Sequence, residues 1–203
     1  MEAFPDLSKS FKDYPKEVIL KDGTGVTLRP LREGDEDLLF EMYAGFPEED
    51  RWFLSHDVAD LKLIKTWVKG TDRNGVLSIV AVLGGNIIAH AALVLRYYGA
   101  KCHIGKIRTS VDPSFRERYL GTWMLLDLIN LAMGLGLKIL EMRLVEGKDD
   151  SIIKSLKKLG FSKEATLRDY SQGRDGNQYD LAIMVKRSQR ALDHNGGRWS
   201  LES

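Results

Sequence analysis

The sequence predicts a single α/β domain built around mostly antiparallel strands. Three consecutive strand candidates, at residues 76–83, 87–97 and 101–111, are joined by short turns, which is typical of antiparallel strands. A helix, a strand and a second helix follow up to residue 159, and a hairpin over residues 163–186 completes the pattern. With 203 residues, the chain is long enough for one sizeable core.

The N-terminal part of the domain is expected to hold one strand and two helices. Apolar and polar residues alternate up to Pro30, as in a short strand. Gly34 and Asp35 then precede a change to helical spacing. The expected elements are a strand over 26–29 and helices over 38–43 and 58–69.

The central strands are separated by turn signals. Gly84-Gly85-Asn86 predicts a hairpin, and Tyr98-Gly99-Ala100 predicts the next turn. Cys102 and His103 would lie on opposite faces of the third strand. We therefore interpret Cys102 as a packed strand residue and not as a nucleophile, which would need a base beside it.

The C-terminal part is predicted from two changes of period. Leu120, Met124 and Leu128 recur at helical spacing, and Gly134 follows near the end of that helix. The remaining elements are a strand over 140–144, a helix over 152–159, and hairpin strands over 163–172 and 178–186. We expect residues 1–25 to be an N-terminal extension, 26–186 to be the domain and 187–203 to be a polar tail.

Composition excludes several classes of protein. A hydrophobic content of 43% with 29% charged residues is ordinary for a globular protein, and no segment is long and apolar enough to span a bilayer. The net charge of +1 provides no global field for nucleic acid or anionic membrane, which favours a small-molecule or protein substrate. The single cysteine and the absence of a secretory signal at the start favour the cytoplasm. Isolated histidines predict no metal site.

A positively charged turn over residues 116–122 links the third central strand to the following helix. Arg116 and Arg118 lie where this helix begins, and the first N–H groups of a helix are unpaired and carry the positive end of its dipole. The combination is typical of a phosphate site and suits a pyrophosphate. The alternative is an ordinary strand-to-helix connection with solvated arginines.

This turn resembles the acyl-CoA pyrophosphate loop of the GNAT superfamily of N-acetyltransferases. The loop's pattern is Arg or Gln, two residues of any kind, Gly, one residue of any kind, and Gly or Ala; its three fixed positions fall on Arg116, Tyr119 and Gly121. Arg116 and Gly121 match, whereas Tyr119 stands in place of the usual glycine, and Glu117 stands where a further glycine is common. Leu159-Gly160-Phe161 matches the end of the family's second motif, and the order of elements matches the family's fold along nearly the whole chain. The resemblance implies a mixed, mostly antiparallel central sheet with helices on both faces.

The same resemblance implies acetyl-CoA or another acyl-CoA as co-substrate. The strands ending at Val111 and near Val145 would splay apart, with pantetheine between them. The residues implied to bind the donor are Thr109, Val111, Arg116, Arg118, Tyr119, Leu120, Gly121, Thr122 and Asp149. Asp149 stands where the family has asparagine, and its place before a helix also suits an N-terminal cap.

Transfer to an amine needs a base for the ammonium proton and an acid for the leaving thiolate. The resemblance places the family's tyrosine acid at Leu156 and its glutamate base at Gly105 or Ile107, so this chain lacks both. We expect Glu146, at the end of the 140–145 strand, to act as the base, and Tyr170, near the hairpin tip, to act as the acid.

Each of these assignments has an alternative. Glu146 suits a solvated loop, and Tyr170 suits a cross-strand partner of Tyr179. His103 would serve as the base if its strand bulged at Gly105.

The acidic run Glu48-Glu49-Asp50 lies between two expected helices, a loop that borders the acceptor site in the family. Its carboxylates would attract a cationic amine and Trp52 would offer a ring, so we expect Glu49 and Trp52 to bind the acceptor. The alternative is a solvated acidic face. Residues 18–30 and 48–51 further resemble the GNAT domains of acyl-CoA-synthetase-fused protein lysine acetyltransferases, which implies a lysine acceptor.

The expected function is direct transfer of an acyl group from acyl-CoA to a primary amine of a small molecule or a protein lysine, by a monomer or homodimer. The rival is a non-catalytic acyl-CoA-binding regulatory or interaction domain. An N-acyl hydrolase or an unrelated structural α/β domain is a more distant alternative.

Overall fold

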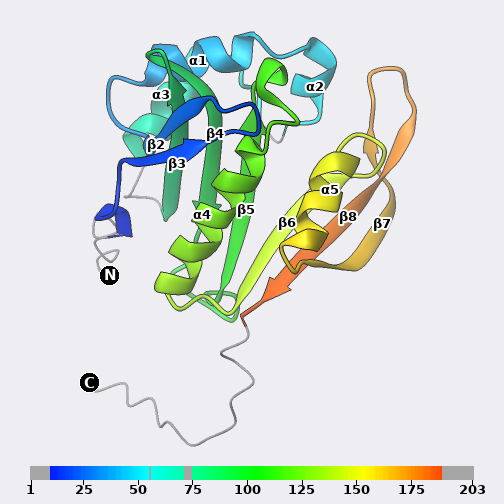
Figure 1. The fold of residues 1–203 in the computed structure, drawn as a ribbon. Helices are drawn as coiled ribbons and strands as arrows, with labels where there is room; N and C mark the ends of the chain where they lie inside the picture. Colours follow the sequence, from blue (N-terminus) through cyan, green and yellow to red (C-terminus); the bar gives the residue numbers. More distant parts are fainter. Residues whose placement is uncertain (1–9, 55, 71–74, 189–203) are drawn as a thin grey trace, which may run out of the picture.

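An eight-stranded sheet runs through the computed structural model, which describes residues 10–54, 56–70 and 75–188 (Figure 1). The strand order is β1-β2-β3-β4-β5-β6-β8-β7. The strands are β1 Lys16–Ile19, β2 Gly25–Pro30, β3 Val76–Leu83, β4 Asn86–Val94, β5 Ile104–Val111, β6 Ile139–Val145, β7 Ser162–Gln172 and β8 Gln178–Arg187. The helices are α1 Glu36–Ala44, α2 Glu48–Trp52, α3 Leu61–Gly70, α4 Leu120–Gly134 and α5 Asp150–Lys158, with a 3-10 turn over Pro113–Phe115.

Helices cover both faces of this sheet, as predicted. On one face, α4 places Leu120, Met124 and Leu128 against apolar residues of β4 and β5. On the other face, α1 and α3 form a second core with Val80 of β3 and Ile87 of β4. The predicted α/β class is therefore confirmed, and the sheet lies between two hydrophobic layers.

Two short elements were not predicted. β1 lies in the segment expected to be an extension, and it pairs antiparallel with β2 from Lys16–Leu28 to Ile19–Gly25. α2 follows α1 directly and contains the acidic run. The polar tail lies outside the described residues from position 189 onward, as does His194.

The third central strand begins later than expected. β5 starts at Ile104, and residues 101–103 form a turn in which the N–H of Cys102 donates to the Gly99 carbonyl at 3.0 Å. Cys102 is exposed in that turn, so its assignment as a packed strand residue was wrong. The turn begins directly after the predicted Tyr98-Gly99-Ala100 signal, which simply extends further than its sequence indicated.

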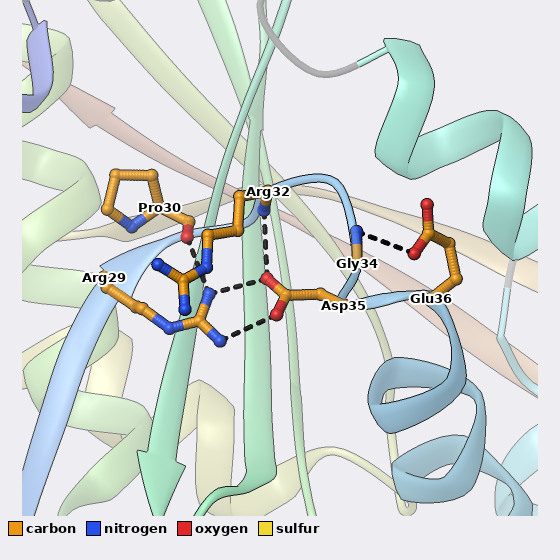
Figure 2. A network of polar contacts seen from close by, with 6 residues as sticks. All are labelled: Arg29, Pro30, Arg32, Gly34, Asp35 and Glu36. Atoms are coloured by element: carbon orange, nitrogen blue, oxygen red, sulfur yellow. Dashed lines mark hydrogen bonds and ion pairs between the residues drawn. The ribbon is translucent and has the colours of Figure 1, made fainter.

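A nearly buried ion pair fixes the start of α1 against β2 (Figure 2). Arg29 donates from Nη1 and Nη2 to the two oxygens of Asp35, at 2.6 and 2.8 Å. Asp35 also accepts from the Arg32 N–H at 3.0 Å, and the Gly34 N–H donates to Glu36 at 2.9 Å. Asp35 precedes the helix but caps none of its N–H groups, because its carboxylate is used by the strand and the turn before it.

The sheet divides between β5 and β6. These two strands run parallel and pair only from Ile104–Ile139 to Lys106–Glu141, whereas the other neighbouring strands pair antiparallel. Beyond that point they diverge toward the end of the sheet where α2 and the tip of the β7–β8 hairpin lie (Figure 1). Among the described residues, no helix has the length and apolar character needed to cross a bilayer.

Candidate functional site

The diverging part of β5 and β6 leaves one edge of each strand unpaired. Residues 107–111 of β5 still pair with β4 on the other side, and residues 142–145 of β6 still pair with β8. Thr109 on β5 has a buried hydroxyl oxygen with no hydrogen-bond partner. Because buried backbone and hydroxyl groups are almost always paired, these edges suit a ligand that supplies amide groups.

The turn after β5 keeps a backbone normally built from glycine. Glu117 has φ of 62° and Tyr119 has φ of 67°, so both residues adopt the left-handed conformation. That conformation costs a residue with a side chain roughly 1–2 kcal/mol. The exposed ring of Tyr119 lies near Lys21, whose Nζ is 5.8 Å from the ring centroid. Glu117 and Tyr119 therefore adopt the left-handed φ values that glycine usually provides in such a turn.

The start of α4 faces the end of β5. The Trp123 N–H makes the first helical bond, to the Tyr119 carbonyl at 3.0 Å, so the N–H groups of Leu120, Gly121 and Thr122 precede it. A Cβ placed on Gly121 would lie 3.6 Å from Val111 Cγ2. The helix start can therefore present its N–H groups to an anion beside the last residue of β5.

Both arginines of the turn are paired with carboxylates. Arg116 Nη2 lies 2.7 Å from Asp50 Oδ2, and Arg116 Nε donates to the Val111 carbonyl at 3.3 Å. Arg118 Nη1 donates to Asp22 Oδ2 at 2.8 Å. The Asp50 oxygen is buried without a well-oriented donor, so charge attraction is what links it to Arg116. Both side chains remain more than 40% exposed, so the alternative of a connection with solvated arginines stays open, with each arginine held by a carboxylate.

Asp149 closes the turn between β6 and α5. Its Oδ2 accepts the Val145 N–H at 2.8 Å, and its own N–H donates to the Val145 carbonyl at 2.8 Å. Asp149 is the residue before α5 but makes no side-chain bond to the helix, so the capping interpretation was wrong. Burial raises its pKa, against the opposing effects of the Val145 N–H and the positive charge of Arg116.

Glu146 is held on the outer side of β6. Its carboxylate accepts from Lys163 Nζ at 3.0 and 3.3 Å and from Thr166 Oγ1 at 3.2 Å, both on β7. Because β7 lies beyond β8, this side chain extends away from β5. Glu146 lies in the turn after β6 and is 33% exposed, so the solvated-loop alternative stays open, and a base role for Glu146 requires release from Lys163.

Tyr170 lies at an irregularity in β7. The pairing with β8 shifts between Leu167 and Ser171, and Asp169 has φ of 52°. Ser171, not Tyr170, is opposite Tyr179, so the cross-strand alternative was wrong. The Tyr170 side chain is exposed.

The remaining catalytic alternatives are excluded by position. His103 precedes β5 at the end where β5 and β6 are paired, roughly 26 Å along the strand from Val111 at about 3.3 Å per residue. Residues Lys106 to Val111 pair with β4 without a register shift, so this pairing gives no sign of the bulge on which a base role for His103 would depend. Leu156 is fully buried in the core.

The acidic run on α2 forms ion pairs with three separate parts of the chain. Glu48 pairs with Arg174 at the hairpin tip, Glu49 with Lys148 after β6, and Asp50 with Arg116. Trp52 Nε1 also donates to the Gln172 carbonyl at 2.7 Å. The acidic run therefore lies on an exposed face, as the alternative expected, but its carboxylates are all in ion pairs, and α2 connects the two halves of the sheet at the end where β5 and β6 diverge.

A second polar group on α1 and β4 is buried outside this region. Tyr43 OH lies 2.9 Å from His90 Nδ1, and the ring of Trp67 stacks on that of His90. His90 Nε2 has no partner, and burial lowers the pKa of His90 to about 4.

Among the described residues, no three His, Cys, Asp or Glu side chains come together in a way that could hold a metal ion.

Comparisons with known proteins agree with this geometry. The family model described as "Acetyltransferase (GNAT) family" matches residues 36–161. A comparison with curated proteins finds no significant match. Solved structures with the same fold include the GNAT domain of S. lividans PAT, with a TM-score of 0.70 at 16% identity over 86% of this chain and 97% of that one.

Two further structures extend the likeness. The ribosomal-protein-alanine N-acetyltransferase from Brucella melitensis gives a TM-score of 0.68 at 23% identity, covering 79% of this chain and 99% of its own. An N-acetyltransferase from Staphylococcus aureus Mu50 gives 0.70 at 19% identity, covering 81% and 99%. At these identities the structures show a common fold.

Proposed function

Because the chain belongs to the GNAT family of acetyltransferases, we propose that it transfers an acetyl group from acetyl-CoA to a primary amine of a small molecule or a protein lysine. The observation that carries this proposal is the divergence of β5 and β6 beside the start of α4. An unpaired strand edge can hydrogen-bond to the amide groups of pantetheine, and the unpaired N–H groups at a helix start can bind the pyrophosphate.

The donor is proposed to lie along β5 and end at α4. Main-chain groups of Thr109 and Val111 would pair with pantetheine amides, and the N–H groups of residues 120–122 would bind the pyrophosphate. Arg116 and Arg118 would exchange their carboxylate partners, Asp50 and Asp22, for phosphate oxygens. Binding of the donor therefore breaks two ion pairs of the free protein.

The proposed reaction is direct transfer. The amine, once it has lost its ammonium proton, attacks the thioester carbonyl carbon, and the C–S bond breaks as the new C–N bond forms. The ammonium proton goes to a base before the attack. The acid gives a proton to the leaving thiolate and is restored by the second proton that the nitrogen loses as the amide forms. We propose Glu146 as the base, after it leaves Lys163, and Tyr170 as the acid. Acetyl-CoA supplies the activated acyl group.

The first test is donor binding together with turnover. Acetyl-CoA at about a hundredfold excess over its Kd should stabilise the fold by roughly 2.7 kcal/mol. CoA release with an amine library then measures transfer. The Arg116→Ala, Arg118→Ala double variant should lose affinity for CoA but not for pantetheine, which lacks the phosphates. A folded protein with no melting shift would exclude acyl-CoA as its ligand.

Glu146→Gln tests the base. It should leave acetyl-CoA affinity nearly unchanged, because the proposed donor contacts lie on β5 and α4. Turnover should fall by on the order of 10² to 10⁴, and the loss should shrink at higher pH, where the amine deprotonates unaided. Lys163→Met, which removes the ion-pair partner, is the matched control. An unchanged rate in Glu146→Gln would assign the base elsewhere.

A second candidate function is a non-catalytic acyl-CoA-binding domain. It is favoured by the placement of Leu156 in the core and of Glu146 on Lys163, since neither position provides a free proton group beside β5. This candidate predicts stabilisation by acetyl-CoA and no CoA release with any amine.

A further inference from the structure

We propose that Glu49, Phe53 and Tyr179 form a binding site for an ammonium group of the acceptor, and that the chain's own Lys148 fills this site in the free protein. The inference rests on the proposed function in naming the acceptor as the ligand. It replaces the expected pair of Glu49 and Trp52 with a set of three side chains.

The three side chains surround one positive charge. Lys148 Nζ forms an ion pair with Glu49, and it lies 5.4 Å from the ring centroid of Phe53 and 5.2 Å from that of Tyr179. The two rings meet edge to face, with centroids 5.4 Å apart. A carboxylate with two aromatic faces binds an ammonium by charge and by the ring quadrupoles together.

The set is assembled from both halves of the sheet. Glu49 is in α2 and Phe53 follows it by four residues, so both side chains lie on the same side of the helix. Tyr179 is on β8, and Lys148 follows β6 in the turn before α5. The site therefore lies at the end of the sheet where β5 and β6 diverge, next to the unpaired edges proposed to hold the donor.

Its chemistry selects a cation. The pKa of Lys148 is raised, chiefly by its hydrogen bond to Glu49, which shows that the surroundings favour the charged amine. Trp52 is not available for this purpose, because Arg174 lies over its ring at 5.0 Å and its N–H is bonded to Gln172. An acceptor carrying an ammonium group, such as a lysine side chain, fits these three side chains. A neutral side chain of the same length would form no ion pair with Glu49.

Lys148 is a competitor that a ligand can displace. The Glu49 side chain is 70% exposed, so an incoming ammonium reaches it from solvent, and Lys148 can leave to water. A tethered group competes with an effective concentration on the order of millimolar. If Lys148 leaves the site free about a tenth of the time, the affinity for an external ammonium is reduced about tenfold.

The test is binding without donor, so that it does not depend on turnover. The probe is Nα-acetyl-lysine amide, and Nα-acetyl-norleucine amide is the neutral control; both are titrated by NMR shifts of the protein amides. Lys148→Met keeps the aliphatic stem against the rings and should tighten binding of the lysine probe about tenfold. Lys154→Met, on the exposed side of α5, should leave it unchanged.

Adding Glu49→Gln to Lys148→Met should reverse the gain. Equal affinity of Lys148→Met and the wild type for the lysine probe, or equal affinity of Lys148→Met for the lysine and norleucine probes, would overturn the inference. Loss of stability in Lys148→Met without tighter binding would likewise overturn it, since Lys148 would then only tie α2 to β8. Absence of CoA release in a protein that binds the lysine probe would refute the proposed transfer and leave the ammonium site standing.

Discussion

Asp50→Asn should change stability and donor affinity in opposite directions. Asp50 pairs with Arg116 at 2.7 Å, and the two side chains are 35% and 45% exposed. Measured exposed pairs contribute about 0.2–1 kcal/mol, and partial burial favours the upper half of that range. Removing the charge should therefore lower the free energy of unfolding of the free protein by roughly 0.5–1 kcal/mol.

The same substitution should strengthen acetyl-CoA binding. In the proposed complex the donor's phosphates pair with Arg116, so binding to the wild type would include breaking the Asp50 pair. Without that cost, the Kd should fall about two- to fivefold, the equivalent of roughly 0.5–1 kcal/mol. The effect should disappear at about 1 M salt, where exposed charges are screened.

Urea unfolding measures the first effect and isothermal titration calorimetry the second. Asp22→Asn, which frees Arg118, should behave in the same way. Glu48→Gln is the control, because its partner Arg174 lies at the hairpin tip and not in the turn over residues 116–122. A Kd that stays constant or rises in Asp50→Asn, in a folded protein, would refute the role of Arg116 in binding phosphate.

Three further substitutions test the fold. Asp35→Ala should cost about 3 kcal/mol in urea unfolding, because it leaves Arg29 only 15% exposed and without its partner (Figure 2). His90 is neutral when folded because burial lowers its pKa to about 4. Its contribution to stability is complete above the unfolded pKa of about 6.5 and is lost as the pH falls from there toward about 4, so His90→Gln should flatten the stability profile over that window. Leu156→Tyr should destabilise by about 1–3 kcal/mol and leave CoA release no faster, because the fully buried site has no room for the ring and hydroxyl. A faster rate in a stable Leu156→Tyr protein would contradict that placement.

The elements that could be predicted from sequence are those with a repeated apolar pattern or a clear turn signal. The helical spacing of Leu120, Met124 and Leu128 places α4, and turn signals separate the central strands, because both depend on residues close in the chain. β1 was missed because four residues carry little periodicity, and its pairing with β2 forms only in the folded chain.

The turn over residues 116–122 shows how much of a local structure its own sequence can predict. Arg116 and Arg118 identify it, and its order of strand, turn and helix follows from the sequence around it. The left-handed conformation of Glu117 and Tyr119 could not be predicted, since most residues with side chains avoid it. The rest of the fold holds these two residues in a conformation that glycine would adopt at lower cost.

The amino-acid sequence by itself determined the class of fold, the order of the main elements and the family likeness, since these rest on local periodicity and short motifs. Only the tertiary structure decided which charges meet: Glu49 finds Lys148 at 99 residues' separation, and Glu48 finds Arg174 at 126. It also directed Glu146 toward Lys163 and buried Leu156 in the core. The physical reason is that these contacts depend on the path of the whole chain, and no periodicity in a local window records which distant side chain will be the partner.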